Sequence, residues 1–251
     1  MKLTRFIESC ALPLRIHAHI AQGASVSARR KIQRILATTI ASLVLASPVS
    51  AAVVNWDGGG GNDNIGNAAN WNPDGAPASD LVNTDLVFDG TVRLTPNFNA
   101  AFSANSITFA SNAAANAFTF GGSALTIGAG GIVNNDANTQ TFGNNVGIGT
   151  ANSTFNAANG ALTFNGTVAL GANALAVNGT NATTFTGAIT GTGTITKSGA
   201  GAMNISATAT AIGADFNLTA GTTTLVATGT TQTLGSTSTV AVSAAGTFCH
   251  Q

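Results

Sequence analysis

Charged side chains are scarce in this chain, at 7% of its 251 residues, against about a quarter in an average soluble domain. The few charges are also segregated. Before residue 35 there are seven Lys or Arg residues and one acid, Glu8, a balance of 7 − 1 = +6. The remainder has two basic residues, Arg93 and Lys197, and eight aspartates, a balance of 2 − 8 = −6. Because this body has no basic patch that could neutralise phosphates, the sequence argues against nucleic-acid binding.

Four reactive residue types are missing from the body of the chain. Between Ala52 and Phe248 there is no Glu, His, Cys or Tyr, and these side chains supply most general acids, general bases and nucleophiles near neutral pH. The two cysteines, Cys10 and Cys249, lie near opposite ends of the chain, so no disulfide framework is indicated. We therefore expect a protein that is not an enzyme, with no catalytic residues and no organic cofactor.

The leader, residues 1–51, has the pattern of an extended secretory signal peptide. Arg29–Lys31 and Arg34 form a positive region, Ile35–Ala46 is apolar, and small residues lead up to Ala51. The apolar run of about 12 residues is too short to cross a bilayer, which takes about 20. The sequence thus predicts Sec export with cleavage after Ala51 or one residue later, a secreted or cell-surface location, and no membrane span.

Short runs of β-forming residues recur from Ser106 to Phe248, separated by Gly, Asn or Ala-Asn. In runs such as Leu162–Phe164 and Leu175–Val177, apolar side chains alternate with small or polar ones, as in strands with one buried face. Aromatic residues are few, and Asn and Gly recur at the breaks. This pattern favours a right-handed β-solenoid of short strands over the alternative, a β-sandwich.

Two segments of the body resemble a known bacterial family. The first contains two tryptophans and a run of glycines, and its matching residues are Asn55–Gly61, Asn70-Trp71, Pro77, Asp80 and Leu86–Phe88. The second is Gly191–Ser206, with the sequence GTGTITKSGAGAMNIS, and Ala220–Leu225 (AGTTTL) follows it. Together they are similar to the opening segment and the repeat core of proteins that carry autotransporter-associated β-strand repeats.

The resemblance implies a fragment of an extracellular β-helical passenger. It predicts a Trp/Gly/Asp-rich N-terminal cap segment at residues 52–105 and a strand-repeat region at 106–248, whereas residues 249–251 depart from the pattern and indicate truncation. The expected function is a structural or adhesive surface that makes many weak contacts through Thr, Asn and Ser faces, with an extracellular glycan or a neighbouring cell as partner. Two alternatives stay open: a carbohydrate-binding or carbohydrate-processing module that uses Trp56–Phe88, and a truncated product without function.

One short motif is typical of a metal site. Gly58–Gly66 matches the nonapeptide G-G-x-G-x-D-x-U-x of calcium-binding β-rolls, with Asp57, Asp63 and Asp74 as candidate Ca²⁺ ligands. Such rolls need tandem copies to supply six to eight oxygen ligands, and a second copy is missing. The sequence therefore favours a Gly/Asn loop over a calcium site.

The two tryptophans, Trp56 and Trp71, have two interpretations. They could form a platform that stacks on sugar rings, or they could cap the first turn of the solenoid and shield it from water and from edge pairing. Because only 6% of the residues are aromatic, the cap is favoured.

Two further expectations concern the repeat region. Thr-rich stretches such as Thr192–Thr196 could form a flat threonine array that binds ice. The T-x-T steps keep no regular period, which argues against ice binding. The last strands, near Val240–Phe248, lack a recognisable cap. We therefore expect copies of the chain to self-associate there.

Overall fold

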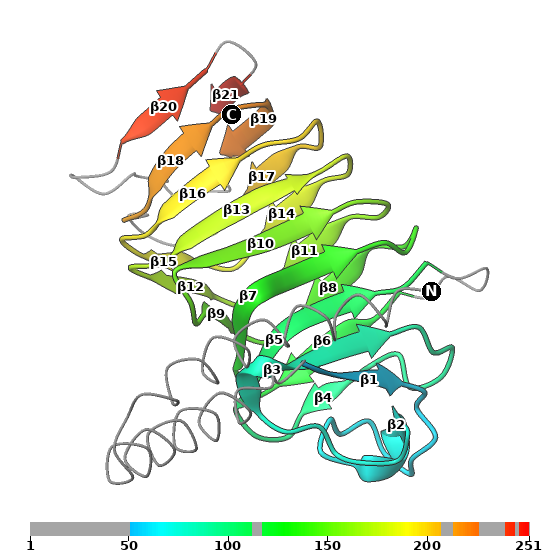
Figure 1. Cartoon of the computed structure of the whole chain (residues 1–251). Helices are drawn as coiled ribbons and strands as arrows, with labels where there is room; N and C mark the ends of the chain where they lie inside the picture. The colour runs from blue at the N-terminus through cyan, green and yellow to red at the C-terminus, as the bar shows by residue number, and fades with distance from the viewer. Residues whose placement is uncertain (1–50, 112–116, 207–212, 226–238, 244–245, 251) are drawn as a thin grey trace, which may run out of the picture. The chain divides into compact units, whose positions relative to one another are not determined.

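The structure, a computed structural model, describes residues 51–111, 117–206, 213–225, 239–243 and 246–250. These residues contain no α-helix, and a single 3-10 helix, η1 (Ala68–Asn70), interrupts a succession of strands (Figure 1). In chain order the strands are β1 (Ala52–Trp56), β2 (Trp71–Asn72), β3 (Asp80–Phe88), β4 (Asn97–Phe98), β5 (Phe102–Phe109), β6 (Thr119–Gly122), β7 (Leu125–Asn134), β8 (Gln140–Phe142), β9 (Val146–Ile148), β10 (Asn152–Ala157), β11 (Leu162–Phe164), β12 (Val168–Gly171), β13 (Ala174–Gly179), β14 (Thr183–Phe185), β15 (Ile189–Gly191), β16 (Thr194–Lys197), β17 (Met203–Ile205), β18 (Asp215–Leu218), β19 (Gly221–Leu225), β20 (Val240–Val242) and β21 (Gly246–His250).

The strands stack as a β-solenoid of about seven turns. A 13-stranded sheet follows the order β2-β1-β3-β5-β7-β10-β13-β16-β18-β20, with β9, β12 and β15 attached beside it. An 8-stranded sheet follows the order β4-β6-β8-β11-β14-β17-β19-β21. Among the described strands, only β1 and β2 pair antiparallel. A sandwich would consist of antiparallel sheets, so the solenoid prediction is confirmed and the sandwich alternative is wrong.

The turns of the solenoid differ in length, although their strands stay in register. Phe120 pairs with Phe142, and Phe142 with Phe164, which are steps of 22 residues. The next steps, to Phe185 and then to Ile205, take 21 and 20 residues. The connections between strands absorb these differences, which explains why the sequence shows no fixed repeat.

The interior is filled by side chains that alternate with outward ones. In β8, β11 and β14 the first and third residues are buried and the middle residue is not. Behind the 8-stranded sheet, the rings of Phe120, Phe142, Phe164 and Phe185 stack at successive centroid distances of 4.8, 5.1 and 5.4 Å. Such pairs add about 0.5–1.5 kcal/mol each beyond the burial of their area. The stack therefore stabilises each turn against its neighbour.

The expected N-terminal cap segment, residues 52–105, is continuous with the repeat region. Its strand β3 pairs in parallel with β5, which begins at Phe102. One hydrophobic core extends from Trp56 to Leu225. The segment is thus the first part of the same solenoid and shares its core.

The chain remains in register to the last described residues. Cys249 and His250 belong to β21 and pair with Thr224 and Leu225 of β19, although the sequence predicts an off-pattern tail from residue 249. The predicted signal peptide, apart from Ala51, lies outside the described residues. In the part of the chain that the structure describes, no helix has the length and apolarity needed to cross a membrane.

Candidate functional site

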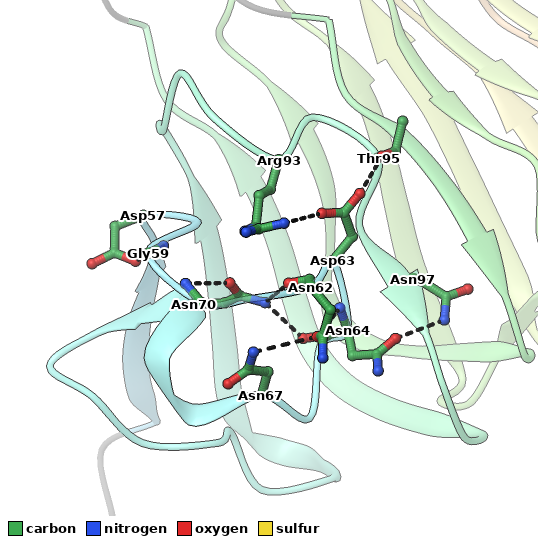
Figure 2. A network of polar contacts seen from close by, with 11 residues as sticks. Asp57, Gly59, Asn62, Asp63, Asn64, Asn67, Asn70, Arg93, Thr95 and Asn97 are labelled. Atoms are coloured by element: carbon green, nitrogen blue, oxygen red, sulfur yellow. Dashed lines mark hydrogen bonds and ion pairs between the residues drawn. The ribbon is translucent and has the colours of Figure 1, made fainter.

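Asn side chains hold together the glycine-rich loop that follows β1. Asn70 is fully buried, and its side-chain oxygen accepts a hydrogen bond from the N–H of Gly60 at 2.9 Å (Figure 2). Its amide nitrogen donates to the backbone oxygens of Asn62, at 2.8 Å, and Asn64, at 2.9 Å. Asn67 is the N-cap of η1, and its side chain accepts from the N–H of Ala69 at 3.2 Å. Asn70 and Asn67 thus brace the Gly/Asn loop from within.

Asp63, the motif aspartate of the calcium hypothesis, is bonded to two residues from the segment before β4. Arg93 Nη1 lies 3.0 Å from Asp63 Oδ1, and the hydroxyl of Thr95 donates to Oδ2 at 2.5 Å (Figure 2). The Thr95 hydrogen bond, followed by the Arg93 hydrogen bond, holds the pKa of the Asp63 carboxyl below its usual value. Arg93 has a φ of 51°, a conformation that is uncommon for residues other than glycine. Both Asp63 oxygens therefore join the glycine-rich loop to the segment that carries Arg93 and Thr95.

The other two candidate ligands of calcium lie apart from this pair of bonds. Asp57 is exposed and accepts from the N–H of Gly59 at 3.0 Å, and Asp74 is exposed in the loop after β2. Within the described ranges, no group of three or more His, Cys, Asp or Glu side chains could hold a metal ion. The structure thus does not bring Asp57, Asp63 and Asp74 together as one oxygen cage.

The two tryptophans meet inside the first turns of the solenoid. Trp56 and Trp71 are both 0% exposed, with ring centroids 5.2 Å apart in an edge-to-face arrangement. Trp71 Nε1 donates to the backbone oxygen of Ile65 at 2.8 Å, and both rings contact Phe88. Neither ring has a free face for a sugar. They lie where a cap would lie, at the N-terminal end of the core.

A column of five threonines and one asparagine runs along the outer face of the 8-stranded sheet. The strand registers place one outward residue of each strand beside the next, and this threonine column consists of Thr119, Thr141, Thr163, Thr184, Asn204 and Thr224. Each lies between two buried residues along the chain, and none of these six strands contains a charged residue. Strand spacing sets one column residue every ~4.8 Å.

The threonine column lies outside the T-x-T stretches that the sequence singles out. Thr196 of one such stretch is in register with Ala176 and Asn217 and forms no threonine array. Thr141, Thr163 and Thr184, in contrast, lie in register on successive turns. The loops that connect the strands differ in length from turn to turn, while the strands themselves stay in register. The signal in the sequence is the apolar-Thr-apolar triplet itself, as in Leu162–Phe164, rather than its period.

A buried cation, Lys197, is not expected from the sequence. Lys197 is 1% exposed, in register between Val177 and Leu218 of the neighbouring turns. Its Nζ donates to the backbone oxygens of Ser198 and Gly199, each at 2.9 Å. Burial lowers the pKa of the Lys197 ammonium. Lys197 therefore ties a strand to the turn that follows it.

Comparison with known proteins gives no relative for this chain: no protein-family model, no curated protein and no solved structure matches it. The β-helical repeat architecture rests on the structure itself. Membership of the family with autotransporter-associated repeats stays a prediction from the sequence.

Proposed function

We propose that this chain is an exported, non-catalytic surface scaffold that binds its target through the threonine column. The observation that carries the proposal is the register of Thr141, Thr163 and Thr184 and their neighbours on one uncharged outer face. The target is an extracellular glycan or the surface of a neighbouring cell. The resemblance of the sequence to passenger-type proteins implies such a surface role.

The structure supports a mechanism based on many weak contacts. A single hydroxyl contact contributes little, about 1 kcal/mol or less after exchange with water. Residues held at a fixed repeat on a stiff body can engage a repeating ligand together, so their contributions accumulate as avidity. The face carries no charge, so we expect binding that depends little on salt.

Export and the absence of catalysis rest on the sequence. The leader at residues 1–51 has the pattern of a secretion signal. The body has no Glu, His, Cys or Tyr between Ala52 and Phe248, so abundant Ser and Thr have no histidine to activate them. These features favour a mechanical role over an enzymatic one.

Removal of the hydroxyls tests the proposal. The triple variant Thr141→Val/Thr163→Val/Thr184→Val keeps the shape of each side chain and its strand propensity. Each lost hydroxyl contact should cost about 0.5 kcal/mol, so we expect the variant to bind cellulose and chitin particles about tenfold more weakly. The control is Thr154→Val/Thr196→Val, on outward positions of the 13-stranded sheet. If wild-type protein binds neither particle nor whole cells, or if the triple variant binds as well as the control, the threonine column is not the binding face.

The same register favours an ice surface as a second candidate target. Hydroxyls at a regular spacing of ~4.8 Å on an uncharged sheet could order water in a periodic array. Thermal hysteresis and inhibition of ice recrystallisation measure this directly. Activity that is present in the wild type and lost in the triple variant would support ice; equal ice growth with and without wild-type protein would reject it.

A further inference from the structure

A second column of residues lies beside the threonine column on the outer face of the 8-stranded sheet. It holds the residue two positions earlier in each turn, and its backbone continues the parallel ladder. The N–H of Gln140 donates to Ala161 O at 3.0 Å, and the N–H of Thr183 donates to Ala202 O at 2.9 Å. We call this row the flanking column, and its residues are Thr139, Ala161, Ala182, Ala202 and Thr222. The threonine column thus has only small side chains on this side.

The opposite side of the threonine column is a tight corner of the solenoid. The Thr186 hydroxyl donates to Asn165 Oδ1 at 2.6 Å, so these two side chains are bonded to each other. Next to Thr186, a Cβ atom added at Gly187 would clash with the backbone oxygen of Gly166. The outward residues of this corner are Gly143, Asn165, Thr186 and Ser206. None of these four carries a side chain larger than asparagine.

The threonine column and its two sides form a flat face without walls. Neighbouring residues are ~4.8 Å apart from strand to strand and roughly 6.7 Å apart along each strand. The outward residues of 139–143, 161–165, 182–186 and 202–206 include no charge and no aromatic ring. The stacked rings of Phe142, Phe164 and Phe185 support this face from within. Because sites for small ligands are usually concave, this face is shaped for a partner that is itself flat.

A flat and ordered partner can contact all three rows of residues at once. A flexible single chain loses conformational entropy when it binds, whereas chains packed side by side in a solid have already lost it. Each further contact with the solid therefore adds to the binding. Thr hydroxyls and the Asn204 amide both donate and accept hydrogen bonds, as the hydroxyls of an uncharged sugar polymer require. An array matched to ice would need the same group at every step, and Asn204 departs from that uniformity.

We propose that the threonine column binds the flat surface of a crystalline, uncharged polysaccharide, in preference to a single or disordered chain of the same sugar. This inference rests on the proposed function and adds the physical state of the ligand. Ala161, Ala182 and Ala202 determine the preference, because their methyl groups leave room for a second polymer chain beside the one on the threonine column. A larger side chain at these positions would hold the solid away from the hydroxyls.

Crystalline and amorphous cellulose have the same chemistry and differ in order, so together they test the preference. At equal accessible surface area, we expect the full chain to bind the crystalline form about tenfold more tightly. Excess soluble cellohexaose should not release the bound protein. The same comparison applies to crystalline and swollen chitin.

The outcomes separate this inference from the proposed function. Equal binding to the crystalline and amorphous forms, or release by cellohexaose, would overturn the preference and leave the proposed function standing. Binding to none of these glycans would overturn both. Inhibition of ice growth without binding to any of the solids would assign the flat face to ice and overturn the inference.

Matched substitutions test the role of the flanking column. Ala182→Ile places a stiff, branched side chain beside the threonine column, and Ala176→Ile places the same side chain on an outward position of β13 in the 13-stranded sheet. We expect Ala182→Ile to bind crystalline cellulose about tenfold more weakly and amorphous cellulose as the wild type does. Ala176→Ile should bind both forms as the wild type does.

Two controls keep this test decisive. Circular dichroism shows whether Ala182→Ile folds, and Ala161→Ile should repeat its effect one turn earlier. The triple Thr→Val variant should weaken binding to both forms of cellulose, so loss of the hydroxyls and loss of the flat face give different results. Equal binding of Ala182→Ile and Ala176→Ile to the crystalline form would contradict the inference.

Discussion

We expect Lys197 to make the stability of this protein depend on pH in a range where few other groups titrate. Its ammonium is buried beside backbone oxygens, and burial lowers its pKa from the ordinary value of 10.5. Between the lowered pKa and 10.5 the unfolded chain binds more protons than the folded chain. Stability therefore rises with pH across that window and is flat below the lowered pKa, where both states are protonated.

The magnitude follows from proton linkage. One proton taken up by the unfolded state alone gives a slope of at most about 1.4 kcal/mol per pH unit. Few other side chains titrate at alkaline pH and contribute to this slope, because the chain has no Tyr, and the other two lysines, Lys2 and Lys31, lie in the leader. The free energy of unfolding in urea, measured at intervals from pH 8 to pH 11, gives the slope.

Lys197→Met removes the titrating group and keeps a long, flexible side chain. We expect the rise of stability between neutral and alkaline pH to disappear in this variant. Its stability at pH 7 combines two opposing changes: no buried charge remains, and the backbone oxygens of Ser198 and Gly199 lose their donor. A wild type and a Met variant with parallel pH profiles would refute the reasoning, since Lys197 would then titrate alike in both states.

Four further outcomes are expected. Phe164→Ala removes a fully buried ring that stacks on Phe142 and Phe185. It should lower the free energy of unfolding by about 3–5 kcal/mol in urea titrations. A decrease as small as that caused by a substitution of an exposed residue would contradict the stack. The pKa of Asp63 is lowered, so the stability that its carboxylate contributes is full above the ordinary pKa and is lost as pH falls through the lowered pKa. Asp63→Asn should therefore reduce the fall of the melting temperature at acid pH. An equal fall in the variant and the wild type would count against the pair of Asp63 and Arg93. Addition of Ca²⁺ or of a chelator should leave the melting temperature unchanged, because Asp63 is already bonded; a rise with Ca²⁺ would restore the calcium hypothesis. In a host with a secretory pathway, N-terminal sequencing should find Ala52 or Val53 first, and an exported product that keeps residues 1–51 would exclude the predicted cleavage.

The strands and the fold class could be predicted because each strand carries its own local signal. Triplets such as Leu162–Phe164 alternate apolar and polar side chains, and Asn and Gly mark the breaks between them. The partner of each strand could not be predicted, since turns of 20 to 25 residues follow one another without a fixed period. The threonine column is a property of that register. It becomes visible only when Thr141 and Thr163 are placed side by side.

The environment of single polar residues was also beyond the reach of the sequence. Lys197 lies on an inward strand position, and a lysine is by default expected at the surface. The glycine-rich motif around Asp63 predicted a loop, but its partner Arg93 lies 30 residues further on. The Trp56 and Trp71 rings needed a three-dimensional account of what surrounds them before the sugar platform could be judged. In each case a contact between distant segments decides the chemistry.

The register of the threonine column is the central claim, and one distance tests it most directly. Thr119 and Thr224 are the first and last residues of the column, five strand steps apart, or roughly 24 Å between backbones. Spin labels at Thr119→Cys and Thr224→Cys, in a chain without Cys10 and Cys249 and diluted with unlabelled protein, report this separation by pulsed electron resonance. A narrow distribution consistent with that spacing is the expected result. A broad distribution, or a distance far from it, would contradict the solenoid register on which the proposed function depends.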